Sequence, residues 1–205
     1  MDEYNNADYE LDKLPKGHTE ELRQYIPRQD ETEVSDLARK AIEEELRPTE
    51  EANKAADFAK TFLEKETVYD MSKGKQSENP LLGDPPYQMS NASFVYWCYK
   101  EAGINLRGGD LSHTIQTIKN STNLETIGRI GSNLDDSNLA YGDIILFNND
   151  KHIGIYIGEG NFISFLGGGV NNYSGGARVR TLRTGKWRRL FRGHILRHRE
   201  EDEIG

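Results

Sequence analysis

Apolar residues recur every three or four positions through the N-terminal half of the chain, which is the spacing of amphipathic helices. One such run follows Ser35, covers residues 37–46 and ends at Pro48. A second run follows Thr49 and covers residues 52–63. The pattern predicts two helices, with Ser35 and Thr49 as their N-caps.

A third apolar run, residues 93–102, is rich in aromatic residues and is followed by Gly103. Its ending, Lys-Glu-Ala-Gly, is typical of a helix C-terminus, so we predict a buried helix rather than a strand. Glycine and proline interrupt residues 70–88, which are predicted to form a loop. A short helix is expected over residues 112–119.

The apolar spacing changes after Gly142 to that of short strands separated by turns. Helices followed by an antiparallel sheet form the α+β class. The predicted strands are residues 143–147, 153–157, 161–165, 179–182 and 193–197.

Charge is distributed unevenly along the chain, whose net charge is −8. Residues 1–66 contain 19 acidic and 10 basic side chains. Because residues 1–34 also lack apolar periodicity, they predict an extended or disordered arm that orders on a partner. We therefore divide the chain into an acidic, partly helical or extended arm (1–49), one domain (50–200) and an acidic tail (201–205).

The C-terminal stretch Arg178–Arg199 carries nine Lys or Arg residues and no acidic residue. It suits an anionic polymer, such as a cell wall or a nucleic acid, and it equally suits a solvated face on an edge strand. The net charge of −8 and the lack of a base-reading motif argue against nucleic acid. Trp187 is interpreted as part of a hairpin edge.

Several classes of site and location are not expected. Cys98 is the single cysteine, so no intrachain disulfide can form. No pair of Cys or His residues has ligand spacing, so neither a metal nor another cofactor is predicted. No apolar run is long enough for a transmembrane helix, and the acidic N-terminus is unlike a signal peptide. We expect synthesis in the cytoplasm, with access to a cell wall only through a virion or a secretion machine.

The chain has the frame of a cysteine hydrolase. Such enzymes hold a thiolate at a helix N-terminus, activate it with a histidine and orient that histidine with a third polar group. Here a loop ending at Ala92 leads into the predicted buried helix, and His152 stands at the head of a predicted strand.

Three motifs make the resemblance specific: Phe94-Val95, Gly142-Asp143 and His152-x-Gly-Ile-Tyr-Ile-Gly occur in order. From about Ala52 to Arg197 the sequence resembles the NlpC-type cell-wall cysteine peptidases. The resemblance implies a papain-like domain, with N-terminal helices packed on an antiparallel sheet. It also implies peptidoglycan as the substrate, with cleavage of its stem peptides often next to D-glutamate.

The resemblance also assigns site positions. The family's Asp-Cys-Ser step falls on Ser90-Asn91-Ala92, so Asn91 stands at the nucleophile position, or Ala92 does if the alignment shifts by one residue. Neither side chain can attack a carbonyl. His152 falls on the base and Ser164 on the orienting position.

Other polar and aromatic residues receive weaker assignments. Tyr69, Ser90 and Ser93 are assigned to the substrate groove. Cys98 lies about 10 Å along the helix from Asn91, so it is interpreted as a small core residue. Three further histidines lack any motif around them and are expected at the surface: His113, His194 and His198.

Two functional hypotheses follow. The first is a peptidoglycan endopeptidase lineage that is inactive as written, through natural divergence or engineering; the change at Ser90 favours divergence. The second is a non-catalytic binding or assembly module. It would use the inherited groove, and it would use residues 1–49 to dock onto a protein partner such as a phage tail or a secretion apparatus.

Overall fold

The computed structural model describes residues 36–37, 40, 47–75, 79–106, 114–130, 138–167 and 175–200. The chain divides into two units, Met1–Arg47 and Pro48–Gly205. In the first unit, Asp36, Leu37 and Lys40 are helical, as expected for the helix after Ser35. The proposed disordered arm, His113 and the acidic tail lie outside the described residues.

The predicted helices of the second unit are present. Helix α4 (Glu50–Thr61) begins after Thr49, whose hydroxyl accepts a hydrogen bond from the Ala52 amide at 3.2 Å. It buries a face of four alanines and continues into the short 3₁₀ helix η1 (Phe62–Glu64). The aromatic run forms α5 (Asn91–Glu101), and residues after Thr114 form α6 (Ile115–Lys119).

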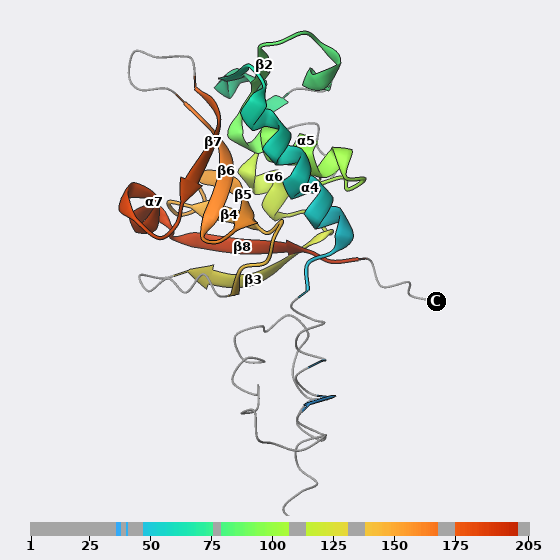
Figure 1. Cartoon of the computed structure of the whole chain (residues 1–205), viewed down its shortest axis with the longest axis vertical. Coiled ribbons are helices and arrows are strands. Elements are labelled where there is room, and N and C mark those ends of the chain that lie inside the picture. The colour runs from blue at the N-terminus through green and yellow to red at the C-terminus, as the bar shows by residue number, and fades with distance from the viewer. Residues whose placement is uncertain are drawn as a thin grey trace, which may run out of the picture. The chain divides into compact units, whose positions relative to one another are not determined.

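Six antiparallel strands form the main sheet, in the order β3-β8-β4-β5-β6-β7 (Figure 1). Strands β4 to β7 are a meander, and β8 returns to pair with β4. The five predicted strands are confirmed, whereas β3 was not predicted. The strands are β3 (Leu124–Ile130), β4 (Ile144–Phe147), β5 (His152–Gly158), β6 (Asn161–Leu166), β7 (Gly176–Thr181) and β8 (Gly193–His198).

The segment predicted as a loop holds short regular elements. Strands β1 (Thr67–Tyr69) and β2 (Tyr87–Met89) pair in parallel, and between them lie the 3₁₀ helices η2 (Met71–Lys75) and η3 (Pro80–Leu82). The loop prediction was wrong for residues 87–88, which belong to β2. A three-residue strand is too short for its alternating pattern to be recognised in the sequence.

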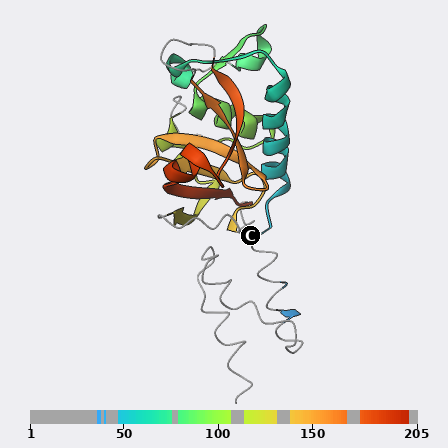
Figure 2. The ribbon, with the colours of Figure 1, turned by 60° about the vertical axis from the view of Figure 1, so that its left-hand side comes forward.

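Alternating side chains divide the sheet into two apolar faces. On β4, Ile144 and Leu146 belong to the cluster that includes the buried residues of α4 and α5, whereas Ile145 and Phe147 belong to a second cluster. Helices α4 and α5 cover the first face (Figure 2). Helix α7 (Gly185–Leu190) contributes to the second cluster through Trp187.

Trp187 corrects an interpretation made from the sequence. It does not lie on a hairpin edge: it is half-buried in α7, and its ring contacts Phe147 and Phe162 at centroid distances of 5.4 and 5.3 Å. A turn was expected between the predicted strands 179–182 and 193–197, but Gly185 begins a helix there.

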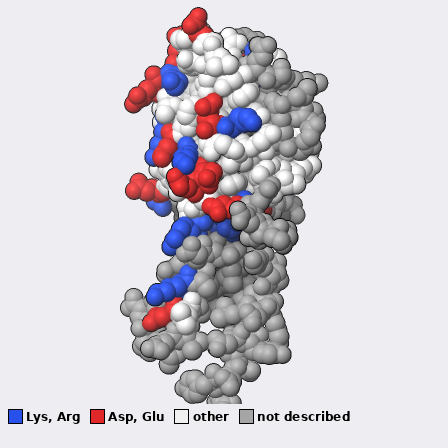
Figure 3. Space-filling view, turned by 90° about the vertical axis from the view of Figure 1, so that its right-hand side faces the viewer, with Lys and Arg blue, Asp and Glu red and all other residues white. Residues whose placement is uncertain are grey.

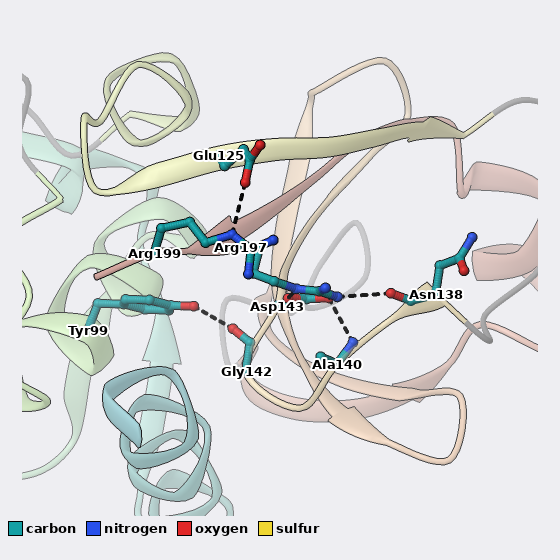
Figure 4. Close-up of polar contacts among 8 residues, drawn as sticks. All are labelled: Tyr99, Glu125, Asn138, Ala140, Gly142, Asp143, Arg197 and Arg199. Carbon is teal, nitrogen blue, oxygen red and sulfur yellow. Dashed lines mark hydrogen bonds and ion pairs between the residues drawn. The ribbon is translucent and has the colours of Figure 1, made fainter. Parts of the chain in front are cut away.

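A buried ion pair joins β8 to the residue before β4 (Figure 4). Arg197 donates to both carboxylate oxygens of Asp143, from Nε at 2.8 Å and from Nη2 at 2.7 Å, and both side chains are 1% exposed. The Ala140 amide donates to the same carboxylate at 2.8 Å. Arg197 was grouped with a solvated basic face, and that expectation was wrong for this residue.

The outer face of α4 carries side chains of both signs (Figure 3). Lys54 pairs with Glu50 on this surface at 2.8 Å. None of the described helices combines the length and the apolar character needed to cross a membrane.

Candidate active site

The candidate site lies at the end of the sheet where β5 begins and β6 ends. The Tyr69 amide donates to Gly175 O at 2.7 Å, just before β7, and Leu166 pairs with Gly176. The Asp70 amide donates to Met89 O at 3.0 Å, just before α5. These contacts bring the N-terminus of α5 to the end of the sheet that carries His152.

The residue at the expected nucleophile position, Asn91, hydrogen-bonds within its own helix end. Asn91 is the first residue of α5, and its Oδ1 accepts from the Ala92 amide at 2.8 Å. Ser90 is the N-cap, and its hydroxyl accepts from the Ser93 amide at 3.1 Å. Ala92, the alternative nucleophile position, is 3% exposed. The polar groups at this helix end therefore satisfy the first amides of α5.

Ser93 lies in the interior. Its side chain is fully buried, and its hydroxyl donates to Lys73 O at 2.5 Å. It thereby ties α5 to η2. This hydrogen bond explains why a serine is buried at position 93, and it does not require contact with a substrate.

His152 is half-buried at the first residue of β5. It pairs across the sheet with Phe147, and its ring meets Trp187 edge-on at a centroid distance of 5.6 Å. The imidazole therefore lies on the second apolar face, beside α7. Its Nδ1 is buried and has no hydrogen-bond partner.

The environment of His152 favours the neutral imidazole. Burial lowers the pKa of His152 below its usual value, and the positive charge of Lys186 lowers it further. A neutral ring with an uncommitted nitrogen can accept a proton, which is the task of a general base.

Ser164 does not orient this imidazole. It is 1% exposed on β6, and its hydroxyl donates to Ile153 O at 2.6 Å. Among the described residues, no hydrogen bond links the side chains of Asn91, His152 and Ser164. The sequence positions thus supply a candidate base, but no nucleophile and no third group hydrogen-bonded to that base.

Cys98 is a core residue, as expected. It is fully buried in α5, and burial raises the pKa of its thiol well above the usual value. A buried thiol of this kind is unreactive.

A cavity of about 590 Å³ adjoins the first part of the domain, between η2, η3 and β2. Tyr69 is half-buried nearby on β1, and a side chain at Gly167 would meet its ring at 3.4 Å. Neither Asn91 nor His152 lines the cavity. Its lining residues are Lys73, Asn79, Pro80, Leu82, Gly83, Asp84, Pro86 and Gln88.

Two histidines expected at the surface belong to internal contacts instead. His198 is 6% exposed, and its Nδ1 lies 2.6 Å from Thr49 Oγ1. His194 Nδ1 lies 2.9 Å from both carboxylate oxygens of Asp150. The surface expectation was wrong because both residues lie on β8, which is flanked by β3 and β4. The described residues contain no cluster of three or more His, Cys, Asp or Glu side chains suited to a metal ion.

Known proteins resemble parts of this chain. The sequence profile of the NlpC/P60 family matches residues 74–195. The peptidoglycan DL-endopeptidase CwlO of Bacillus licheniformis is 29% identical over 109 residues, which are 52% of this chain and 20% of that protein. This chain thus spans about a fifth of its curated relative. A solved structure of a mutant of the Resuscitation Promoting Factor Interacting protein RipA shares 17% identity, with a TM-score of 0.46 over 72% of this chain and 63% of that one.

Proposed function

The chain belongs to the NlpC/P60 family, and from that premise we propose that it descends from peptidoglycan endopeptidases and, as written, binds stem peptides without cleaving them. The observation that carries the proposal is Asn91 at the first position of α5. The family places its cysteine nucleophile at this helix end.

The chemistry of the site supports the loss of cleavage. A carboxamide has no nucleophilic lone pair comparable to that of a thiolate, and Oδ1 of Asn91 is engaged with the Ala92 amide. His152 remains able to accept a proton, because its pKa is lowered and its Nδ1 has no partner. The base has been kept while the group that it would activate is missing.

Restoring the thiol tests this proposal. We expect Asn91→Cys to release muropeptides from purified peptidoglycan at a rate at least about a hundredfold above that of the unmodified chain, since a helix N-terminus lowers the pKa of a thiol and His152, at the same end of the sheet, can accept a proton. Chromatography of the soluble products measures the release. The unmodified chain should instead co-sediment with peptidoglycan and release nothing.

Two matched variants complete the test. Ala92→Cys places a thiol one residue away and distinguishes the two alignments of the motif. Asn91→Cys combined with His152→Ala should lose the restored activity. Cleavage by the unmodified chain, or inactivity of both cysteine variants, would contradict the endopeptidase ancestry of this site.

A second candidate function rests on the division of the chain into two units. Residues 1–47 form their own unit, with 14 acidic against 7 basic side chains. Such a segment suits docking onto a protein partner, for example in a phage tail or a secretion apparatus that delivers the domain to a wall. Deleting residues 1–47 should leave the melting temperature of the second unit unchanged while abolishing association with that assembly; retained association would reject the docking role.

A further inference from the structure

We propose that β7 carries a carboxylate-binding strip, formed by Arg178 and Arg180, which selects acidic peptides at the face that holds His152. The proposal rests on the proposed function and specifies the ligand class of the same site. Neither arginine belongs to the motifs that relate the chain to its family.

Strand register places the strip on this face. Arg178 pairs directly with Ser164, and Arg180 pairs directly with Phe162. Directly opposed residues of neighbouring strands share a face of the sheet. Phe162 belongs to the second cluster and contacts Trp187, whose ring also contacts His152. With strands about 4.8 Å apart, β7 lies about 10 Å from β5, which is within the reach of a bound peptide.

Both guanidinium groups are available for an anion. Arg178 and Arg180 are exposed, and each donates one hydrogen bond from Nη1 to the carbonyl of the preceding residue, at 2.8 Å in both cases. A guanidinium group has five N–H donors, and a carboxylate needs only two of them for bidentate binding. The backbone contact fixes each group near the edge of the sheet while leaving donors for a ligand.

Two acidic residues, Asp150 and Glu159, lie in the turns before and after β5, and Asp150 is already paired with Lys119 and His194. None of the strands β4 to β8, nor α7, contains an Asp or Glu residue. Lys186 of α7 adds a positive charge close enough to lower the pKa of His152. An anionic ligand is therefore attracted to this face with no repulsion from these elements.

The position of the strip favours a peptide over a polymer of phosphates. Strand β7 is the last strand of the sheet; β1 and η1 contact it, and the Ala177 amide donates to Thr67 Oγ1. An extended peptide can pair with the backbone of such an edge, and its carboxylates would then lie along the strip. Arginines on an edge strand also discourage aggregation between chains. That role does not require them to lie on the same face as His152.

Calorimetric titration of the full chain tests the proposal. The probes are a stem-type peptide containing D-glutamate with free carboxylates, and the same peptide with those carboxylates converted to amides. We expect the free form to bind at least about tenfold more tightly, because charge-assisted bidentate hydrogen bonds contribute that much. The double change Arg178→Gln and Arg180→Gln should remove the difference.

Arg189→Gln is the matched control, since it removes one exposed charge from α7 outside the strip. It should keep the preference for the free peptide, and Arg178→Lys should retain only part of it. Equal binding of the two peptides by the unmodified chain would overturn the strip while leaving peptide recognition intact. Binding of neither peptide would reject the proposed function as well, and an equal loss in the Arg189 variant would reject the strip in favour of general charge.

Discussion

At the scale of single residues, the proposed chemistry of this domain depends on two positions that the sequence motifs assign, Asn91 and His152. Asn91 offers no nucleophile, and the pKa of His152 is lowered while its Nδ1 has no hydrogen-bond partner. What the motifs do not reveal is the partner of each side chain. The hydroxyl of Ser164 bonds to Ile153 O, although the family position suggested a role beside the imidazole.

The pKa of His152 gives a prediction at this scale. Burial is the larger cause of its lowering, and Lys186 is the smaller. Lys186→Gln should therefore raise the pKa of His152 but leave it below the usual 6.5, whereas Arg189→Gln should leave it unchanged. NMR titration of the imidazole measures both shifts, and an unchanged value in the Lys186 variant would contradict the assignment.

The lowered pKa of His152 also determines how the stability of the fold changes with pH. Because the folded chain binds the proton less readily than the unfolded chain, the contribution of His152 to stability is present above the unfolded pKa. It is lost as the pH falls through the folded pKa. Acidification from neutral pH should therefore lower the melting temperature, and it should do so less in a His152→Gln variant.

At the scale of elements, helices were predicted where capping and periodicity agree. Thr49 marked the start of α4, and Gly103 marked the end of α5 correctly. Several elements escaped prediction: β3, and the shorter β1, β2 and α7, each of six residues or fewer. Their stability comes from contacts with distant segments, such as the contact of Trp187 with Phe147, and local sequence does not encode those contacts.

Thr49 supports a prediction about α4. Its hydroxyl caps the helix at the Ala52 amide and also contacts His198 Nδ1 at 2.6 Å. Thr49→Ala should lower the free energy of unfolding by about 1–2 kcal/mol, the usual cost of a lost cap. Chemical denaturation measures the change. Thr49→Ser should restore most of the stability, and a serine variant as unstable as the alanine variant would show that the methyl group matters instead.

At the scale of the whole molecule, one polar network joins the first helices to the sheet (Figure 4). The Asp143–Arg197 pair connects β4 with β8, and the Tyr99 hydroxyl donates to Gly142 O from α5. Gly142 itself packs so closely on Ala52 of α4 that a side chain there would collide with its backbone, with a separation of 2.4 Å. The Gly-Asp motif is thus explained by close packing and a buried charge.

Removing one partner of the buried Asp143–Arg197 ion pair should lower the free energy of unfolding substantially. Arg197→Met leaves the Asp143 carboxylate buried without its counter-ion, so we expect a loss of about 3–5 kcal/mol in the free energy of unfolding. The double variant Asp143→Leu with Arg197→Met should lose less than the single variant. Urea denaturation of both measures this, and a double variant less stable than the single one would contradict the account.

The sequence by itself determined the α+β class and most of the main helices and strands, and it predicted an empty nucleophile position, because these depend on periodicity, capping and residue identity within short segments. Tertiary structure alone decided that Arg197 is buried, that Trp187 contacts His152, and that Arg178 lies beside Ser164. Those relations join residues 14 to 54 positions apart. Strand register and packing set them, and neither is encoded by the local pattern on either side.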